Sequence, residues 1–567
     1  MTTDRHPTVL HALLDRVEAE PEGPALEIVS GPGQCEVVSW AGLYELARRG
    51  AAGLEAAGLG AGDRLILALP TCREFFALYL GALFRRVVPL VVPAAQPGRR
   101  HGEAGERFAP LCRMLGCRHV AVPAEALEDL AGGLPARALD AAALLEHGRA
   151  ELLPLAVGPG DIAHLQSTSG STGEQKLAVV RHGNIAANVA GIGAAIAVGP
   201  GDKLSIWLPL YHDMGLIAFA CTLYWQRPMV LTDPSNFVRH PIRYWLDLIG
   251  RHRVTITAAP NSAYQVCARL ARRRTFAGLD LSSCRAAFWG AEPIHAETVR
   301  GFERAFAPYG YRPEATLPVY GLAEATLGCT VAEVREPARI RRFAGRTLAE
   351  AAPALGGGDG RVEAVSVGRP LVDHRLRIVG PGRRPLEEGR VGEIEFGGPS
   401  VVDGYWRDGG EPARCAHGDG FLPTGDLGLL LDGELYVVGR SKEIIIVGGR
   451  NFVPVEVELA AARALDPDLH KGVAAFGMPD PIAQTDAVHL LIEAKKLPVD
   501  DRPAVEEAVR DELARALGLR GVAVHWTAKG GIPRTTSGKV QRFRCRELVA
   551  AAPAAGDRPA AAVGREP

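Results

Sequence analysis

Short apolar runs alternate with longer amphipathic stretches along the first part of the chain. Leu65–Leu69 is an apolar run, Cys72–Leu83 after Pro70 has a helical pattern, and Val87–Val92 is apolar again. A strand, a helix and a second strand in this order predict parallel strands in a sheet that is covered on both faces. The fold class expected from this region is therefore α/β.

The same alternation recurs further along the chain. Apolar runs occupy Lys203–Leu208, Val254–Ala259 and Ala286–Gly290, and a helical pattern covers Ala296–Phe306. These segments extend the predicted mostly parallel, doubly covered sheets through much of the protein.

The pattern changes after about Leu376, where glycine and charged residues interrupt short apolar runs. The runs predict strands, and the pairs Glu388–Gly389 and Asp432–Gly433 predict tight turns. We expect an antiparallel, β-barrel-like subdomain in this region. Its expected strands are Val391–Phe396, Leu427–Leu431 and Leu435–Val438.

A small α+β domain is expected from Ser441 onward. Its expected strands and helices are Ile444–Val447, Pro454–Ala464, Gly472–Gly477 and Ala504–Leu517. We therefore predict a large N-terminal domain over 1–440 and a small C-terminal domain over 441–550. The Ala/Pro-rich segment 551–567 is expected to be a disordered tail.

The composition is that of a globular protein, because 47% of the 567 residues are hydrophobic and 23% are charged. This balance excludes a fully disordered chain. The formal net charge of −1 gives no basic field that would attract nucleic acid or anionic membranes. No apolar run reaches the roughly 18 residues of a membrane span. We expect neither a nucleic-acid partner nor a membrane span.

The cellular location expected from the sequence is the cytoplasm. No signal-like apolar core follows Met1–Pro7. The 10 cysteines are scattered, and the closest pair, Cys112 and Cys117, has no second pair or histidine cluster nearby. This spacing disfavours a zinc site and a disulfide framework, and it favours reduced thiols.

The strongest chemical signal is a loop of small polar residues. Ser167–Gly173 consists only of Ser, Thr and Gly, directly follows an apolar segment and precedes Lys176. Backbone N–H groups and hydroxyls in such a loop can surround phosphate oxygens while a lysine neutralises their charge. The alternative is a flexible Ser/Gly loop. The spacing differs from that of a Walker A loop, and no nucleophile-elbow motif occurs here.

This loop resembles the phosphate loop of the adenylate-forming superfamily, which includes acyl-CoA synthetases, peptide-synthetase adenylation domains, luciferases and fatty acyl-AMP ligases. Further segments resemble motifs of the same superfamily, several of them motifs of the fatty acyl-AMP ligases in particular, and they follow in the family's order. These segments are Trp207–Ile217, Leu279–Ser283, Gly290–Pro293, Tyr320–Thr326, Thr424–Gly428, Gly439–Ile446 and Thr535–Arg542. The resemblance extends to about Leu548.

The resemblance implies that the protein uses ATP and Mg²⁺. Glu324 would hold Mg²⁺, a cation that prefers oxygen ligands, Tyr320 would flank the adenine, and Asp426 would accept hydrogen bonds from the ribose hydroxyls. The respective alternatives are a surface carboxylate, a structural tyrosine and a turn residue. The predicted nucleotide-binding residues are Thr168, Ser169, Gly170, Ser171, Thr172, Gly173, Lys176, Gly290, Ala291, Glu292, Tyr320, Gly321, Asp426 and Arg440.

Lys539 is the predicted catalytic residue. In the family, a lysine at this position reaches the acid carboxylate and the α-phosphate when a small, mobile lid domain closes over the large domain. Lys442 aligns with the family's hinge position, where a few backbone angles absorb the rotation between the domains. The alternative for Lys442 is an exposed charge without such a role.

The segment Trp207–Ile217 resembles the family's acid-binding motif. We do not expect His212 and Asp213 to act as a general base, because a carboxylate needs no deprotonation at neutral pH. The family has an aromatic or imidazole gate at this position, and a packed core histidine is the alternative. The predicted substrate-pocket residues are His212, Asp213, Met214, Gly215, Ala218 and Trp289.

Several residues depart from the family pattern. Ala218 and Trp289 are larger than the usual residues and would narrow a long acid tunnel, and Ser262 replaces an expected phenylalanine. Extra volume in a tight site costs ~1–3 kcal/mol. We therefore hypothesise an acid that is shorter or more specialised than a plain long-chain fatty acid.

The function expected from the resemblance is ATP-dependent conversion of a carboxylic acid, fatty or related, into an acyl-adenylate with release of pyrophosphate. Transfer to the phosphopantetheine thiol of an acyl carrier protein would follow. The long segment Leu327–Ser366 favours this acceptor over CoA, because an insertion here marks the fatty acyl-AMP ligases, and a decorated loop without such a role is the alternative. The alternatives are a CoA ligase or amide-forming ligase for an unusual small acid, and a non-catalytic scaffold suggested by the altered Glu174–Leu177.

Overall fold

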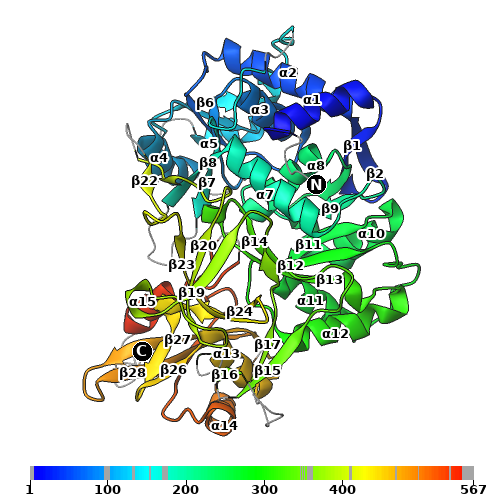
Figure 1. Ribbon diagram of the computed structural model, residues 1–567. Coiled ribbons are helices and arrows are strands. Elements are labelled where there is room, and N and C mark those ends of the chain that lie inside the picture. The colour runs from blue at the N-terminus through cyan, green and yellow to red at the C-terminus, as the bar shows by residue number, and fades with distance from the viewer. Residues whose placement is uncertain are drawn as a thin grey trace, which may run out of the picture. The chain divides into compact units, whose positions relative to one another are not determined.

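The structure of the protein is a computed structural model (Figure 1). It describes residues 6–94, 103–130, 134–151, 155–168, 176–344, 347, 349, 352–353, 362–407, 412–466, 469–495, 497–535 and 538–551. These residues divide into two compact units. The larger takes its described residues from Met1–Ser169, Gln175–Arg342 and Glu363–Val437, and the smaller from Phe343–Val362 and Val438–Pro567.

The expected domain limits at 440 and 550 stay a prediction. The expected disordered tail over 551–567 lies, apart from Ala551, outside the described residues.

One sheet of the larger unit has the strand order β22-β21-β8-β7-β4-β3-β5-β6. β3 pairs in parallel with β4 and β5, and α3 connects β3 to β4, so the strand, helix and strand predicted from Leu65 to Val92 are confirmed. β8, β21 and β22 continue the sheet as antiparallel strands. The bounds are β3 Arg64–Leu67, β4 Val88–Val91, β5 His119–Val122, β6 Arg137–Asp140, β7 Ile162–Thr168, β8 Lys176–Arg181, β21 Gly404–Tyr405 and β22 Ala413–Arg414.

A second sheet of the larger unit has the order β18-β14-β13-β12-β11-β9-β10-β1-β2. The run from β1 through β10, β9, β11 and β12 to β13 is parallel. β2, β14 and β18 pair in antiparallel, and β2 and β18 are the two edge strands. The bounds are β1 Pro24–Gly31, β2 Gln34–Ser39, β9 Leu204–Ile206, β10 Met229–Thr232, β11 Ile256–Pro260, β12 Ala286–Gly290, β13 Thr316–Gly321, β14 Gly328–Val331 and β18 Arg369–Pro370. The predicted α/β fold with mostly parallel sheets is therefore confirmed.

Helices join these strands, as Figure 1 shows for α11 and α12 beside the green strands β11 to β13. Both faces of a central parallel strand are covered in such an arrangement, and all four residues of β4 and of β10 are accordingly buried. The bounds are α1 Val9–Ala19, α2 Trp40–Ala56, α3 Arg73–Phe84, α4 Glu103–Leu115, α5 Leu127–Leu130, α6 Ala141–Leu144, α7 His182–Ala195, α8 Asp213–Trp225, α9 Pro234–Arg239, α10 Asp247–His252, α11 Asn261–Ala271 and α12 Ala296–Phe306.

Glycines allow α2 and α3 to pack closely. A Cβ atom on Gly50 would lie 2.0 Å from the carbonyl oxygen of Ala77, and one on Gly81 would lie 2.4 Å from the backbone nitrogen of Ala51. Because real Cβ atoms do not approach backbone atoms this closely, these two positions require glycine.

None of the described helices is long and apolar enough to cross a membrane.

The region after Leu376 forms a four-stranded sheet of order β19-β20-β23-β24, with β19, β20 and β23 antiparallel. Asp432 and Gly433 have φ angles of 55° and 72°, which are the left-handed values of a tight turn between β23 and β24. The expected antiparallel strands and this turn are therefore present. The bounds are β19 Arg375–Val379, β20 Gly392–Gly397, β23 Leu422–Leu431 and β24 Glu434–Arg440.

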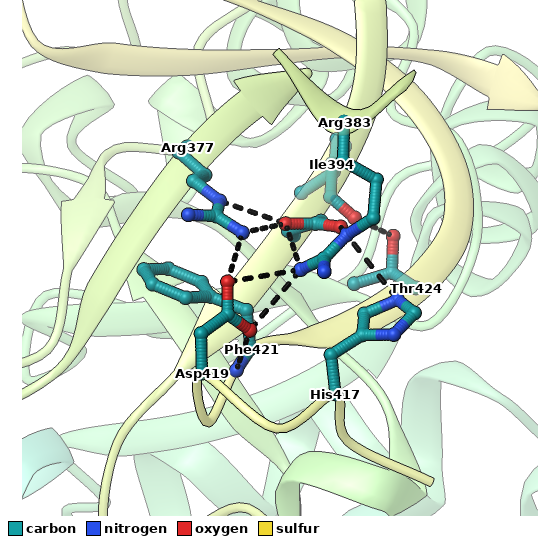
Figure 2. A network of polar contacts seen from close by, with 8 residues as sticks. Arg377, Arg383, Ile394, His417, Asp419, Phe421 and Thr424 are labelled. Carbon is teal, nitrogen blue, oxygen red and sulfur yellow. Dashed lines mark hydrogen bonds and ion pairs between the residues drawn. The ribbon is translucent and has the colours of Figure 1, made fainter. Parts of the chain in front are cut away.

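A charge network fastens β19 and β20 to the loop before β23 (Figure 2). Glu395, which is only 1% exposed, accepts hydrogen bonds from Arg377 Nε at 2.7 Å and from Arg383 Nε at 2.6 Å. Both arginines also bind Asp419. Burial acts to raise the pKa of Glu395, but the two arginines outweigh it and lower that pKa. The network thus holds a buried carboxylate ionised beside β23.

The segment expected to be an insertion, Leu327–Ser366, contains β14, β15 Ile340–Ala344, β16 Ala352–Pro353 and β17 Val362–Val365. Much of its remainder lies outside the described residues. Its role in excluding CoA therefore stays a prediction.

The smaller unit is an α+β arrangement, as the sequence predicts. β27 pairs with β28 in antiparallel and β28 with β29 in parallel, while β25 and β26 form a hairpin. A core that includes Val457, Leu490 and Leu513 joins its helices to the sheet. The bounds are β25 Ile445–Val447, β26 Arg450–Phe452, α13 Pro454–Arg463, β27 His470–Asp480, β28 Thr485–Ala494, α14 Arg502–Leu517, β29 Ala523–Thr527 and α15 Arg542–Ala551.

A second cluster of charged side chains surrounds Glu27 of β1 in the larger unit. Glu27 accepts a hydrogen bond from Lys203 Nζ at 2.7 Å and lies 2.6 Å from His252 Nδ1. The hydrogen bond from His252 lowers the pKa of Glu27 to about 2, with help from Lys203 and against the effect of burial. Cys35 completes a group with the spacing of metal ligands. Because both oxygens of Glu27 are already paired, the geometry favours an ion-pair network over a metal site.

Replacing Glu27 by glutamine is expected to make stability less dependent on pH. The folded-state pKa of about 2 lies below the ordinary 4.5, so the carboxylate stabilises the fold fully above about pH 4.5 and progressively less as the pH falls toward about 2. Urea unfolding at several pH values would measure this. The stability advantage of the wild type over Glu27→Gln should stay constant above about pH 4.5 and shrink from there toward about pH 2. A constant difference over this lower range would contradict the assignment.

Candidate nucleotide-binding site

The predicted phosphate loop connects β7 to β8. Thr168 and Lys176 are directly paired at the open end of this antiparallel hairpin. Thr168 is buried, whereas Lys176 is exposed. The loop residues Ser169, Gly170, Ser171, Thr172 and Gly173 lie outside the described residues. The hairpin therefore brings together both ends of the predicted phosphate loop, and the binding roles of the loop residues stay predictions.

The predicted adenine and ribose residues lie in contact. Tyr320 at the end of β13 donates its hydroxyl hydrogen to Asp426 Oδ2 on β23 at 2.7 Å. Burial, followed by the charge of Asp426, raises the pKa of Tyr320 well above its usual value, so the phenol stays protonated as a donor. Thr424 Oγ1 accepts from the backbone N–H of Asp426 at 3.2 Å and donates to the carbonyl of Ile394 at 2.8 Å. These bonds fix the Asp426 carboxylate next to the Tyr320 ring.

Glu324 lies in a tight turn that begins at Gly321. A Cβ atom on Gly321 would lie 1.9 Å from the carbonyl oxygen of Leu327, so only glycine fits there. Thr326 has a φ of 70° and donates its hydroxyl hydrogen to the Ser400 carbonyl at 2.7 Å, which holds the unusual backbone angle in place. The short helix η5, Ala323–Ala325, presents Glu324 and lies against β7.

Asn188 of α7 forms hydrogen bonds to the backbone of this turn. Its amide nitrogen donates to the carbonyls of Ala325 at 3.2 Å and Gly328 at 2.8 Å, and its amide oxygen accepts from the N–H of Gly328 at 3.1 Å. The side chain is fully buried. Sequence patterns assigned no role to Asn188, because nothing local distinguishes it from other polar residues, and Thr326 appeared only as the last residue of the motif Tyr320–Thr326.

Glu324 and Lys176 approach a common neighbour, Tyr405 of β21. The Tyr405 hydroxyl donates to Glu324 Oε1 at 2.8 Å, and Lys176 Nζ lies 4.9 Å from the centre of the Tyr405 ring. The donor set suits Mg²⁺, because a partly exposed carboxylate supplies the oxygen ligand that this cation prefers. Lys176 and Glu324 therefore share Tyr405 as a neighbour, and the metal role of Glu324 and the phosphate role of Lys176 stay predictions.

The Gly290–Glu292 segment follows β12 closely. A Cβ atom on Gly290 would lie 2.8 Å from Val319 Cγ2, and Ala291 has a φ of 62°. The Glu292 carboxylate accepts hydrogen bonds from Ser262 N at 2.8 Å and Ser262 Oγ at 3.1 Å. Ser262, a departure from the family pattern, thus binds a predicted nucleotide-site residue. The contacts of these three residues with adenine stay predictions.

His212, Asp213 and Met214 form the start of α8. His212 Nδ1 lies 2.6 Å from Asp213 Oδ1, which also accepts from the Met214 N–H at 2.7 Å. A Cβ atom on Gly215 would lie 2.2 Å from the carbonyl oxygen of Pro209. The described contacts of His212 and Asp213 belong to a helix start, and the rejection of a general base stays a prediction. The role of His212 as a gate stays a prediction.

Trp289 belongs to an aromatic core. Its side chain has no exposed surface, stacks on Tyr264 of α11 with ring centres 3.6 Å apart and meets the edge of Phe302 of α12 at 5.7 Å. Ala218 lies half-buried on α8. The indole volume is taken up by packing against two helices, and the predicted pocket role of both residues stays untested.

Lys539 lies in a tight turn of the smaller unit. The Lys539 N–H donates to Thr535 Oγ1 at 3.1 Å, the Thr535 N–H donates to the Lys539 carbonyl at 2.8 Å, and Gly538 has a φ of 88°. The turn presents the Lys539 side chain partly exposed. Thr536 and Ser537 of this motif lie outside the described residues.

A partly buried arginine links the Lys539 turn to the predicted hinge within the smaller unit. Arg542 donates to Glu443 Oε2 and to Glu458 Oε1, each at 2.7 Å. Glu443 follows the exposed Lys442 in the short helix η8, Ser441–Glu443, and Arg440 ends β24 directly before it. The catalytic, ribose and hinge roles of Lys539, Arg440 and Lys442 stay predictions.

The fold and the site define a class of enzyme. The larger unit carries Lys176 at the end of a hydroxyl-rich segment, the Glu324 carboxylate suited to Mg²⁺, and the Tyr320–Asp426 pair. Together they indicate an enzyme that binds a nucleoside triphosphate. The family model described as "AMP-binding enzyme" matches residues 13–406, and the chain belongs to this family. The predicted adenylate-forming ligase is thus confirmed.

Curated relatives and solved structures agree with this family. The chain is 33% identical to a putative acyl-CoA synthetase of Caulobacter vibrioides (88% of this chain, 87% of the relative) and 32% identical to the long-chain-fatty-acid–AMP ligase FadD26 of Mycobacterium bovis (96% and 97%). It is 35% identical to the medium-chain-fatty-acid–[acyl-carrier-protein] ligase JamA of Moorena producens (68% and 67%). A structure from a study of fatty acyl-adenylate ligases of E. coli and L. pneumophila matches with a TM-score of 0.86 at 28% identity (97% and 100%).

Proposed function

We propose that the protein activates a fatty or related carboxylic acid with ATP and passes the acyl group to the thiol of an acyl carrier protein. A carboxylate oxygen attacks the α-phosphorus of ATP, and the bond to the bridging oxygen breaks so that pyrophosphate leaves. The carrier thiolate then attacks the acyl carbon, and AMP leaves with the oxygen that it gained from the acid. No other reactant is needed.

The observation that carries this proposal is the meeting of residues from separate motifs. Tyr320 binds Asp426, and Glu324 shares the neighbour Tyr405 with Lys176. Lys176 supplies positive charge for the β- and γ-phosphates, and the Tyr320–Asp426 pair is suited to the adenosine. Bound at Glu324, Mg²⁺ would neutralise phosphate charge as the transition state forms.

Lys539 completes the proposed mechanism. Both reactants are negative, so a positive charge at the forming bond lowers the barrier more than it favours substrate binding. Lys539 would supply that charge when the smaller unit closes over the larger one with Lys442 at the hinge. Arg440 would assist at the ribose in the same closed state.

One relative supports the carrier protein as acceptor, since JamA is named an acyl-carrier-protein ligase, while FadD26, named a fatty-acid–AMP ligase, supports formation of the acyl-adenylate. The length of the segment Leu327–Ser366 also supports a carrier protein as the acceptor. A CoA ligase is the second candidate, because another relative is named a putative acyl-CoA synthetase. The cytoplasmic location stays a prediction.

The acceptor can be tested by adding either CoA or candidate holo carrier proteins to the enzyme with ATP, Mg²⁺ and a panel of fatty acids. We expect acyl-adenylate with every accepted acid, acylated carrier by intact-protein mass spectrometry, and CoA left unconsumed. Rapid conversion of CoA to acyl-CoA would support the second candidate. Highest turnover with long-chain acids would refute the hypothesis of a shorter or specialised acid.

A further inference from the structure

Tyr405 lies between the two charged side chains that the proposed function assigns to the phosphates and their cation. Its hydroxyl donates to Glu324 Oε1 at 2.8 Å, and its ring lies below Lys176 Nζ at 4.9 Å. The three residues come from β8, η5 and β21, which are far apart in the chain. One aromatic side chain therefore touches both charged groups.

The backbone holds Tyr405 firmly against β8. Tyr405 pairs with Ala178, and the N–H of the following Trp406 donates to the Leu177 carbonyl at 2.8 Å. Lys176 directly precedes this paired stretch. The position of the ring relative to Lys176 is thus set by strand pairing.

Two neighbours strengthen this attachment. Asp403 forms an ion pair with Arg181 at the other end of β8, with Oδ2 and Nε 2.5 Å apart. A Cβ atom on Gly404 would lie 2.1 Å from the carbonyl oxygen of Ala413, so glycine is required where β21 meets β22. Residues on both sides of Tyr405 are therefore fixed independently of its side chain.

The same segment also holds the backbone of Glu324. The Val402 N–H donates to the Glu324 carbonyl at 2.9 Å, while Tyr405 binds one oxygen of the Glu324 carboxylate. Backbone and side chain of Glu324 are thus tied to one short stretch, 402–405. A carboxylate held at Oε1 has a defined orientation, with Oε2 as the atom that can meet a cation.

We propose that Tyr405 is a positioning residue that orients the Glu324 carboxylate for the divalent cation and holds Lys176 beside it. The inference rests on the proposed function and adds to it a residue that couples the cation site to the phosphate lysine. A tyrosine can do both because its hydroxyl is a donor and its ring face attracts an ammonium group. Phenylalanine would keep the second contact and lose the first.

The test uses Mn²⁺ as a probe in place of Mg²⁺, together with a non-hydrolysable ATP analogue. Electron paramagnetic resonance measures the affinity for Mn²⁺, and calorimetry measures the affinity for the analogue without metal. Tyr405→Phe is expected to weaken Mn²⁺ binding about 10-fold, as loss of a group that orients a metal ligand does. Metal-free analogue affinity should stay unchanged, because the ring over which Lys176 lies is kept.

Tyr311→Phe is the matched control. It also removes a tyrosine hydroxyl that bonds another side chain, Thr316 Oγ1 at 3.0 Å, and Thr316 donates in turn to Glu303 rather than to Glu324. We expect its Mn²⁺ affinity to equal that of the wild type. Thermal unfolding of both variants shows whether any change in Mn²⁺ affinity is only a loss of structure.

Tyr405→Leu separates the two contacts. It removes the ring as well, and it is expected to weaken metal-free binding of the ATP analogue about 3-fold while leaving AMP binding unchanged. Only the analogue carries the β- and γ-phosphates that Lys176 is proposed to meet.

The outcomes distinguish this inference from the proposed function. Wild-type Mn²⁺ affinity in Tyr405→Phe together with weak binding in Glu324→Gln would overturn the inference alone. Wild-type Mn²⁺ affinity in Glu324→Gln would overturn the assignment of Glu324 and the inference with it. A wild-type protein that binds no Mn²⁺ with the analogue would refute both.

Discussion

Replacing Lys539 by alanine is expected to lower the rate of acyl-adenylate formation about 100- to 1,000-fold, the usual cost of losing one group that stabilises charge in a transition state. The side chain is needed when charge moves between the carboxylate and the α-phosphate. It is not expected to contribute much to ATP binding, which the phosphate loop, Tyr320 and Asp426 would supply. ATP–pyrophosphate exchange measures the first quantity and calorimetry the second.

The local structure allows Lys539→Ala to remove only the lysine side chain without disturbing the turn. The turn around Lys539 is held by Thr535 Oγ1, by the Thr535 N–H and by the backbone of Gly538, so the lysine side chain can be removed without breaking those bonds. Lys529→Ala removes the same charge from an exposed position of the same unit and should exchange pyrophosphate like the wild type. Equal exchange rates in Lys539→Ala and the wild type would refute the assignment of Lys539.

Replacing Trp289 by alanine is expected to lower the free energy of unfolding by about 3–5 kcal/mol, as is usual for deleting a large buried aromatic side chain. The indole has no exposed surface and packs on Tyr264 and Phe302, so its loss leaves a cavity between two helices. Urea unfolding of the larger unit measures the change. Wild-type stability in Trp289→Ala would contradict the core position.

Trp289→Phe distinguishes core packing from a role in the acid pocket. Phenylalanine keeps an aromatic ring against Tyr264, so most of the stability should remain. If Trp289 also limits the length of the acid, as the sequence predicts, this variant should accept longer acids relative to short ones. An unchanged acid preference would show that the Trp289 indole packs in the core and does not limit the length of the acid.

Local sequence patterns predicted the regular elements well. The predicted strand Ala286–Gly290 and helix Ala296–Phe306 have the same bounds as β12 and α12. In α12 the buried residues Val299, Phe302 and Phe306 recur at helical spacing, which is a signal that a single segment carries by itself. By contrast, β21 has two residues, and no periodic pattern exists over that length.

The site was predictable only as separate motifs. Tyr320 and Asp426 were each assigned to the nucleotide, but their mutual hydrogen bond joins residues 106 positions apart and depends on how β13 and β23 approach each other. Tyr405 is 81 positions from Glu324 and was not predicted, since its neighbours in sequence give no chemical signal. Tertiary contacts of this kind do not show in one sequence.

Ser262 illustrates the same limit. In the sequence, Ser262 was notable only because the family pattern has a phenylalanine at this position. In the structure its backbone and hydroxyl both donate to Glu292, 30 positions away, and a phenylalanine side chain could not make the second bond. A residue that departs from a family pattern can thus have a specific partner that only the fold reveals.

The most direct test of the account follows oxygen atoms from the acid. With a fatty acid labelled with ¹⁸O in its carboxylate, ATP, Mg²⁺ and a holo carrier protein, AMP released during acyl transfer should carry one labelled oxygen, and unlabelled pyrophosphate should form. Label in inorganic phosphate with formation of ADP, or acyl transfer that leaves AMP unlabelled, would contradict attack of the carboxylate on the α-phosphorus.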